Sequence, residues 1–316
     1  ADLLVRGWSV NPVFDAARLA QPEWTKVAAT HSGTSVYVGG KRQGTLDATD
    51  LDASRKYTNP PGLTGSASRA GLSAQAALYP SAWGIREILA YDLAVLWPRA
   101  FDHATKAFED GGREERDRFL QRTGVRDRIL TPRVAGSRTP VMKIPFFLES
   151  YLYDWGGDVA ARVSVVPHGR VVSDTDAQVE ALFEDGWDER QTVIVDRDGV
   201  PEGTPGTPSV PDARLLADQP TFVRAEAQVP EGGGYLVLLD SWDPDWQAEV
   251  DGRPAPVLRA NGLFRAVRLV PGRHEVTWRY RPRTLWAGAA VSAVALTVLA
   301  GLTAARLRRR AGRAAH

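Results

Sequence analysis

Cysteine is absent from this sequence of 316 residues. Its absence excludes disulfide scaffolds, thiolate metal sites and cysteine nucleophiles, and it leaves the redox compartment unassigned. Methionine is almost absent as well, because the single one, Met142, is internal and the chain begins with Ala1. Since a newly made chain starts with methionine, we expect a processed protein or a piece of a longer one.

Charge of one sign is not in excess either. The 39 Lys and Arg residues balance 38 Asp and Glu residues, and the net charge of +1 predicts no nucleic-acid partner. The fractions of hydrophobic residues (43%) and charged residues (24%) are those of a globular protein and exclude a disordered chain. The length fits about two domains, and no repeat recurs with a period of about 20–50 residues.

Known catalytic and metal-binding motifs are lacking. None of the five histidines has the spacing of a ligand motif, no serine stands in a nucleophile elbow, and no P-loop lysine follows the glycines at 232–234. His274 alternates with apolar residues, and we interpret it as a hydrogen-bonded structural residue rather than a catalytic one. The lack of these motifs therefore predicts no catalytic residue, no resident metal and no cofactor, and one divalent cation site stays open at the aspartates described below.

One long uncharged segment stands near the C-terminus. Thr284–Ala305 contains 22 residues without a charge or a proline. A helix of this length measures about 33 Å, enough for a hydrocarbon core of about 30 Å. The alternative is a buried helix of a soluble protein, but the charged flanks favour a transmembrane helix in a cell membrane, with the lipid bilayer as a partner.

The arginines on either side of this segment predict its orientation. Five follow it between Arg306 and Arg313, and three precede it at Arg279, Arg281 and Arg283. The positive-inside rule then favours a basic cytoplasmic tail, 306–316, and an extracytoplasmic body. No signal peptide is recognisable after Ala1, because Arg6 interrupts the first apolar residues. We therefore expect a translocation signal upstream and interpret the chain as the end of a longer membrane protein.

The body is predicted to be α+β, with a mixed α/β domain over 1–196. Strands are expected at Ser35–Val38, before a turn at Gly39–Gly40, and at Ala161–Val166 and Gln191–Val195. The apolar spacing predicts helices over 85–96, Phe101–Glu109 and Glu114–Arg122, and a short helix capped by Asp174 or Thr175.

A small antiparallel β-sandwich is predicted to follow a linker. Residues 197–220 are rich in glycine and proline, which predicts a loop or linker. Between 221 and 283, alternating apolar segments and turn signals at Asp251-Gly252 and Asn261-Gly262 are typical of short strands. The strands are expected at Phe222–Val229, Tyr235–Leu239, Gln247–Val250, Ala255–Leu258, Leu263–Leu269 and Arg273–Tyr280.

The main polar candidates lie between two of these strands. Asp240, Asp243 and Asp245 form either a divalent cation site or a general base, or they bond the backbone of a turn. Trp242 and Trp246 beside them either stack on a sugar ring or pack in the core or at the membrane interface. Trp242, Trp246, Asp243 and Asp245 are the candidate glycan-binding residues.

The same region resembles a family. The segment Tyr235–Trp246, then Ala248–Gly252, Pro271–His274 and Tyr280–Pro282, resembles the C-terminal end of YfhO-type bacterial membrane proteins. The pattern there is an apolar strand, Pro-Gly-Trp, Val-Asp-Gly, Pro-Ala-Gly-x-His and Tyr-x-Pro before the last membrane helix. Asp245 stands where the family usually has glycine.

Weaker likeness extends upstream of that region. Arg86 with Tyr91-Asp92 resembles the family's Arg-Gly-Tyr-Asp stretch, with Ala90 in place of the usual glycine, and Asp188–Val195 resembles the strand before the linker. The likeness covers most of the chain and is strong from about Gly234 to Gly288.

The resemblance implies a polytopic protein related to the GT-C glycosyltransferases. Such enzymes are similar in using polyprenyl-phosphate sugars and an acidic residue in an extracytoplasmic loop near the first helices. This chain would be the extracytoplasmic C-terminal domain plus the last helix, acting on a cell-envelope polymer, with the catalytic site in helices that the chain lacks. The alternative is a non-enzymatic, membrane-anchored carbohydrate-binding or assembly module.

Overall fold

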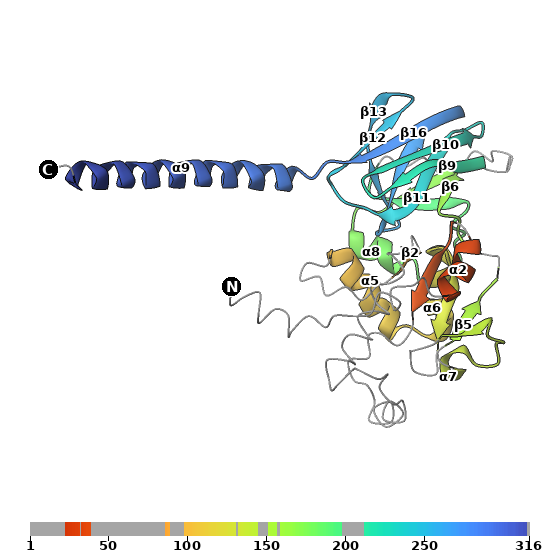
Figure 1. The fold of residues 1–316 in the computed structure, drawn as a ribbon. Helices are drawn as coiled ribbons and strands as arrows, with labels where there is room; N and C mark the ends of the chain where they lie inside the picture. The colour runs from red at the N-terminus through yellow and green to blue at the C-terminus, as the bar shows by residue number, and fades with distance from the viewer. Residues whose placement is uncertain are drawn as a thin grey trace, which may run out of the picture. The chain divides into compact units, whose positions relative to one another are not determined.

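The chain divides into two units. The computed structural model describes residues 23–31, 33–38, 86–88, 98–130, 132–144, 151–156, 159–197 and 212–314. Side chains are not described for Val38, Glu87 and Asp212, nor for residues 284–287, 302 and 305–314. Unit 1 comprises Ala1–Arg162 and Val172–Arg190, and unit 2 comprises Val163–Val171 and Gln191–His316 (Figure 1).

Unit 1 is a mixed sheet with helices. The order of its strands is β2-β1-β3-β5-β4, with β1 parallel to β2 and β3, and β5 antiparallel to β3 and β4. The elements are α2 Glu23–Thr30, β1 Ser35–Val38, β2 Arg86–Glu87, α5 Arg99–Asp110, α6 Arg113–Arg122, β3 Val125–Leu130, α7 Pro132–Ala135, β4 Met142–Lys143, β5 Tyr151–Asp154 and α8 Thr175–Glu180.

Helix α2 covers part of this sheet. Its apolar residues Trp24 and Ala28 pack in one cluster with Val36, Ile129 and Leu152 of strands β1, β3 and β5. Side chains two residues apart on a strand share a face. Asp127, two residues before Ile129, and Asp154, two residues after Leu152, therefore lie on the face of the sheet that α2 covers.

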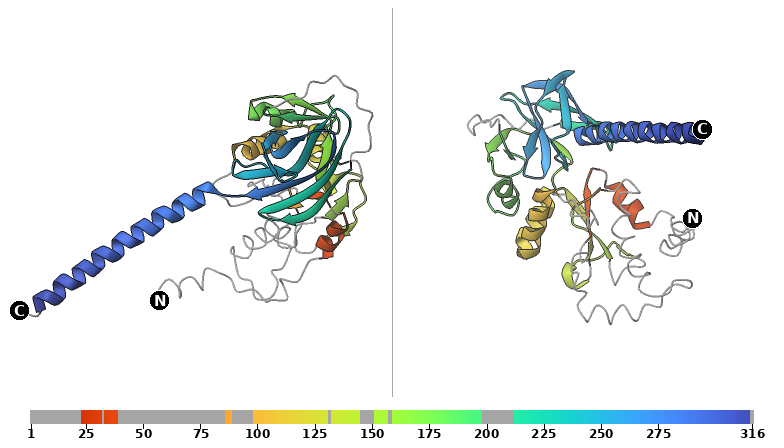
Figure 2. Two further views of the ribbon diagram at one scale, coloured as in Figure 1. Left: turned by 90° about the horizontal axis from the view of Figure 1, so that it is seen from above. Right: turned by 90° about the vertical axis from the view of Figure 1, so that its left-hand side faces the viewer.

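Unit 2 contains two sheets (Figures 1 and 2). Their orders are β13-β12-β16-β10-β9 and β6-β11-β15-β14-β8-β7, and every pairing is antiparallel except that of β7 with β8. The strands are β6 Val163–Val166, β7 His168–Val171, β8 Thr192–Val195, β9 Asp212–Gln219, β10 Phe222–Val229, β11 Gly234–Ser241, β12 Trp246–Val250, β13 Arg253–Ala255, β14 Leu258–Ala260, β15 Phe264–Leu269 and β16 Gly272–Tyr280.

The two sheets share one hydrophobic core. Val223 and Trp278 of the first sheet lie in the same buried cluster as Val165, Leu236 and Val267 of the second. The alternation predicted for 222–229 is confirmed, because all four apolar residues on one face of β10 are buried. The α+β class predicted from the sequence is also confirmed.

Turn chemistry fixes two of the connections. Asp251 and Gly252 join β12 to β13 with φ angles of 51° and 75°, and Asn261 and Gly262 join β14 to β15 with φ angles of 50° and 72°. Two successive left-handed residues match the twist of a hairpin, and aspartate and asparagine tolerate that conformation. Both predicted turns are therefore confirmed.

Two predicted elements are corrected. Arg86 and Glu87 form strand β2 rather than a helix, because they pair in parallel with β1 and this tertiary pairing overrides the local apolar spacing. The predicted strand Ala255–Leu258 is not one strand. Ala255 ends β13 and Leu258 begins β14, and these two strands belong to different sheets. The rest of the helix predicted over 85–96 lies outside the described residues, apart from Ile88, as does the turn predicted at Gly39–Gly40.

The linker prediction is wrong for its last third. Asp212–Gln219 forms β9, which pairs with β10 along its length. Ala213 and Leu215 pack against the core, so a polar sequence serves as an edge strand. The division into units also differs from the predicted boundary at 196/197, since β6, β7 and β8 lie in unit 2.

The last helix, α9, runs from Arg283 to Ala314. It contains the segment 284–305 for which a helix was predicted. Among the residues that the structure describes, no helix combines the length and the apolar character needed to cross a membrane.

Candidate functional site

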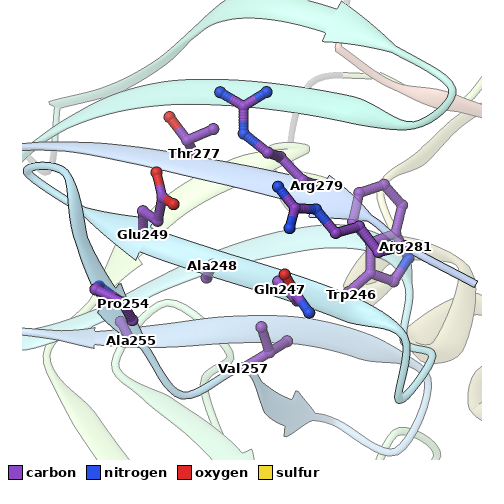
Figure 3. Close-up of a pocket in the computed structure, with 10 residues that line it drawn as sticks. All are labelled: Trp246, Gln247, Ala248, Glu249, Pro254, Ala255, Val257, Thr277, Arg279 and Arg281. Atoms are coloured by element: carbon purple, nitrogen blue, oxygen red, sulfur yellow. The ribbon is translucent and has the colours of Figure 1, made fainter. Parts of the chain in front are cut away.

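A pocket lies on strands β12, β13 and β16 of unit 2. Its volume is about 280 Å³. Its lining combines a tryptophan, two arginines, three other polar side chains and four small or apolar residues. These are Trp246, Gln247, Ala248, Glu249, Pro254, Ala255, Val257, Thr277, Arg279 and Arg281 (Figure 3).

The sheet register places the polar lining on one face. Gln247 is the cross-strand partner of Arg279, and Glu249 is the partner of Thr277. These positions alternate with the buried Ala248 and Trp278, so their side chains point away from the core (Figure 3). The outer face of this sheet therefore forms the polar wall of the pocket.

Arg279 and Arg281 supply positive charge without a carboxylate partner among the described residues. Both side chains are exposed, and the guanidinium carbon of Arg279 lies 4.6 Å from the centre of the Phe222 ring. The same two arginines also line a second, more open hollow with Gln219, Thr221, Phe222 and Tyr280. Two arginines against one glutamate make this surface suited to an anionic ligand.

The predicted aspartates serve the backbone and nearby arginines. Asp243 Oδ1 accepts a hydrogen bond of 2.8 Å from the backbone N–H of Asp245. Asp245 accepts from Arg283 Nε at 2.8 Å and from the backbone N–H of Arg283 at 3.0 Å, and so holds the first residue of α9. Asp240 accepts from Arg265 Nη2 at 3.1 Å. These contacts agree with the turn interpretation rather than with a shared cation.

Both predicted tryptophans are stacked on arginines, Trp242 on Arg259 of β14 and Trp246 on Arg265 of β15. The guanidinium carbon of Arg259 lies 3.8 Å from the centre of the Trp242 ring, and that of Arg265 lies 3.7 Å from the centre of the Trp246 ring. Trp246 also lies 5.2 Å from the ring of Tyr280. Of the four predicted glycan-binding residues, Trp246 is the one that lines the pocket.

Burial and nearby charges shift the pKa values of two groups beside these rings. Burial raises the pKa of Tyr280, and the negative charges of Asp243 and Asp245 raise it further. Burial lowers the pKa of Arg259, which Asp196 partly offsets.

The sequence predicts Arg279 and Arg281 only as the outer flank of the membrane segment, and not as residues of a pocket. The signal that could have found them is the alternation of β16, which puts Arg279 on the face opposite Trp278. Arg281 directly follows β16, and its position at the pocket depends on the pairing of Trp246 with Tyr280.

A second polar cluster lies in unit 1. His31 Nδ1 is 2.9 Å from Asp127 Oδ2, and His31 Nε2 is 3.8 Å from Asp154 Oδ2. Burial raises the pKa of Asp127, whereas the hydrogen bonds from Arg126 lower the pKa of Asp154 to about 2. In the described part of the chain, these are the ligating side chains close enough to share one metal ion.

The chain matches no family model, no curated protein and no solved structure. The resemblance to YfhO-type proteins therefore stays a prediction.

Proposed function

We propose that this chain is the membrane-anchored, extracytoplasmic part of a cell-envelope glycosyltransferase of the GT-C-like kind. In this proposal α9 crosses the membrane, and the pocket of unit 2 binds the phosphate-bearing glycan at the bilayer surface. The catalytic residues would belong to upstream helices of the parent protein.

The observation that carries the proposal is the apolar surface of α9. Val291, Val294, Leu296, Val298 and Leu299 are 56–70% exposed. At 100° per residue these positions cover an arc of about 200°, and alanines occupy most of the remaining circumference. A helix that is apolar on all sides needs burial in protein or in lipid. The proposed span is the whole uncharged segment 284–305, of which described side chains cover only the part within 288–304.

The pocket supports the ligand class. Arg279 and Arg281 precede α9 by a few residues, so a membrane-embedded α9 would hold them near the lipid headgroups. Arginines bind phosphate oxygens through several N–H groups at once, while Gln247 and Thr277 offer hydrogen bonds to sugar hydroxyls. A polyprenyl-phosphate sugar presents both groups at that depth.

Membrane attachment is tested by flotation of the full chain with lipid vesicles. We expect the wild type to float and the double variant V294K/L296K to stay in the aqueous fraction, because a lysine near the centre of a span costs about 2.5–3.5 kcal/mol. The matched control is V270K, since Val270 is 66% exposed but lies between β15 and β16. If the double variant floats like the wild type, α9 is not the anchor.

Ligand binding is tested with vesicles that contain a polyprenyl-phosphate sugar. We expect R279Q/R281Q to bind about tenfold more weakly, a change of about 1.4 kcal/mol. The control R268Q removes an exposed arginine of β15 and should bind like the wild type. Equal binding by all three proteins would remove the lipid-linked sugar from the proposal and leave the membrane anchor standing.

The alternative is a carbohydrate-binding or assembly module without an enzyme partner. Trp242 and Trp246 are both half-buried, and each ring has an arginine over it, which argues against broad stacking on a neutral glycan. Retained binding of a neutral envelope polymer by R279Q/R281Q would favour this alternative.

A further inference from the structure

The cluster of His31, Asp127 and Asp154 in unit 1 has the features of a metal site. Asp127 on β3 and Asp154 on β5 are direct cross-strand partners, on the face of the sheet that carries Ile129 and Leu152. His31 directly follows the last residue of α2 and reaches both carboxylates. Three separate elements therefore bring one imidazole and two carboxylates together.

Two aspartates in register need a positive charge between them. Like charges directly opposite each other on adjacent strands are destabilising. Arg126 compensates Asp154 through two hydrogen bonds of 2.8 Å, but Asp127 is 1% exposed and has His31 as its hydrogen-bonding partner. A buried carboxylate is costly unless a neighbouring positive charge neutralises it, and a metal ion bound between Asp127 and Asp154 would supply that charge.

The distances fit a coordination sphere. Ligand atoms about 2.0–2.2 Å from a metal ion lie about 3–4 Å apart. His31 Nδ1 lies 2.9 Å from Asp127 Oδ2, whereas the 3.8 Å contact with Asp154 Oδ2 is made by the other ring nitrogen, Nε2. One metal ion binds a single imidazole nitrogen, and one ligand atom from each of the three residues lies within 4.8 Å of the others, so a shift of about 1 Å closes the set around an ion.

The outer contacts orient these ligands as they do in metal sites. Arg126 donates a hydrogen bond to each carboxylate oxygen of Asp154, and the backbone N–H of Gly156 donates to Asp154 Oδ1 at 2.8 Å. Such contacts fix the direction of a ligating carboxylate. The side chain of Asp154 is 28% exposed, so the cluster is closed at Asp127 and open at Asp154. An open side leaves room for a water or substrate ligand.

We propose that His31, Asp127 and Asp154 bind one divalent transition-metal ion, Zn²⁺ or Mn²⁺. The imidazole favours Zn²⁺, the two carboxylates also suit Mn²⁺, and Ca²⁺ and Mg²⁺ prefer oxygen ligands alone. This site is not predictable from the sequence, because His31 and Asp127 are 96 positions apart and neither belongs to a spaced motif. This proposal is independent of the proposed membrane function.

The test is a calorimetric titration of the full chain with Zn²⁺ and with Mn²⁺, each metal alone. We expect one equivalent to bind, and H31Q and D154N each to weaken the affinity at least tenfold, as the loss of a metal ligand does. The matched control is H274Q. His274 pairs with Asp251 at 2.7 Å in the same manner, but no second carboxylate accompanies that pair in the described part of the chain.

Several outcomes would overturn the proposal. If the folded wild type binds neither metal, the cluster is a structural hydrogen-bonded group and the proposal is wrong. If H31Q and D154N bind metal like the wild type, the metal lies elsewhere. Circular dichroism of each variant establishes that it is folded, and two variants on separate elements keep the test decisive if one fails to fold.

Discussion

Replacing Trp278 with alanine should lower the melting temperature of unit 2 by about 10 °C. Trp278 is fully buried in the core that the two sheets share. Removing a buried tryptophan costs about 3–5 kcal/mol, from lost burial and from the cavity left behind. At about 2–4 °C per kcal/mol for a domain of this size, the shift is readily measured by thermal unfolding followed by circular dichroism.

The variant W278F separates packing from hydrogen bonding. The Trp278 N–H is buried and has no hydrogen-bond partner among the described residues. Phenylalanine removes that unsatisfied group and keeps most of the volume, so W278F should cost less than half as much as W278A. A melting temperature of W278A within about 2 °C of the wild type would show that the two sheets do not share a cooperative core.

Replacing Arg122 with methionine should destabilise unit 1 by about 3–5 kcal/mol. The Arg122 side chain is 6% exposed. Its Nη1 donates to the backbone oxygens of Ala181, Leu182 and Glu184 at 3.1, 3.1 and 2.6 Å, and its Nη2 donates to that of Trp187 at 2.8 Å. Methionine fills a similar volume but removes the Arg122 donor from these oxygens, of which that of Ala181 keeps the Trp187 indole N–H at 2.6 Å, and unpaired buried carbonyls are costly.

Two comparisons define the cause of that loss. R122K keeps the charge, but a lysine ammonium cannot match the planar fork, so R122K should be destabilised almost as much as R122M. R113M changes an exposed arginine on the same helix and should unfold like the wild type. The measurement is urea unfolding of the full chain, and equal midpoints for R122M and R113M would contradict the expectation.

Local sequence signals predicted the elements that depend on local physics. Asp174 caps α8 by accepting from the N–H of Ala177 at 2.8 Å, as its position before the helix suggested. The alternation at 222–229 and the turns at Asp251-Gly252 and Asn261-Gly262 were enough to place β10 and two hairpins. In each case the residues that form the structure are neighbours in the chain.

Elements that depend on distant partners were not predictable in this way. Strand β2 exists because Arg86 and Glu87 pair with β1, about fifty residues upstream. The metal-binding cluster likewise needs the register of β3 with β5 and the end of α2, which no spacing in the sequence encodes. The pocket arginines follow from the pairing of β12 with β16.

The path of the chain between its units bears on how the protein is made. Strand β6 pairs with β11, where Val166 lies opposite Tyr235, 69 residues later in the sequence. At about 5–20 residues per second on the ribosome, β6 must wait about 3–14 s for its partner. The segment 172–190, which belongs to unit 1, emerges during that interval. The sheet β13-β12-β16-β10-β9 is complete only when β16 pairs with β10 and β12. Because α9 directly follows β16 in the sequence, this sheet is completed as the apolar helix is synthesised.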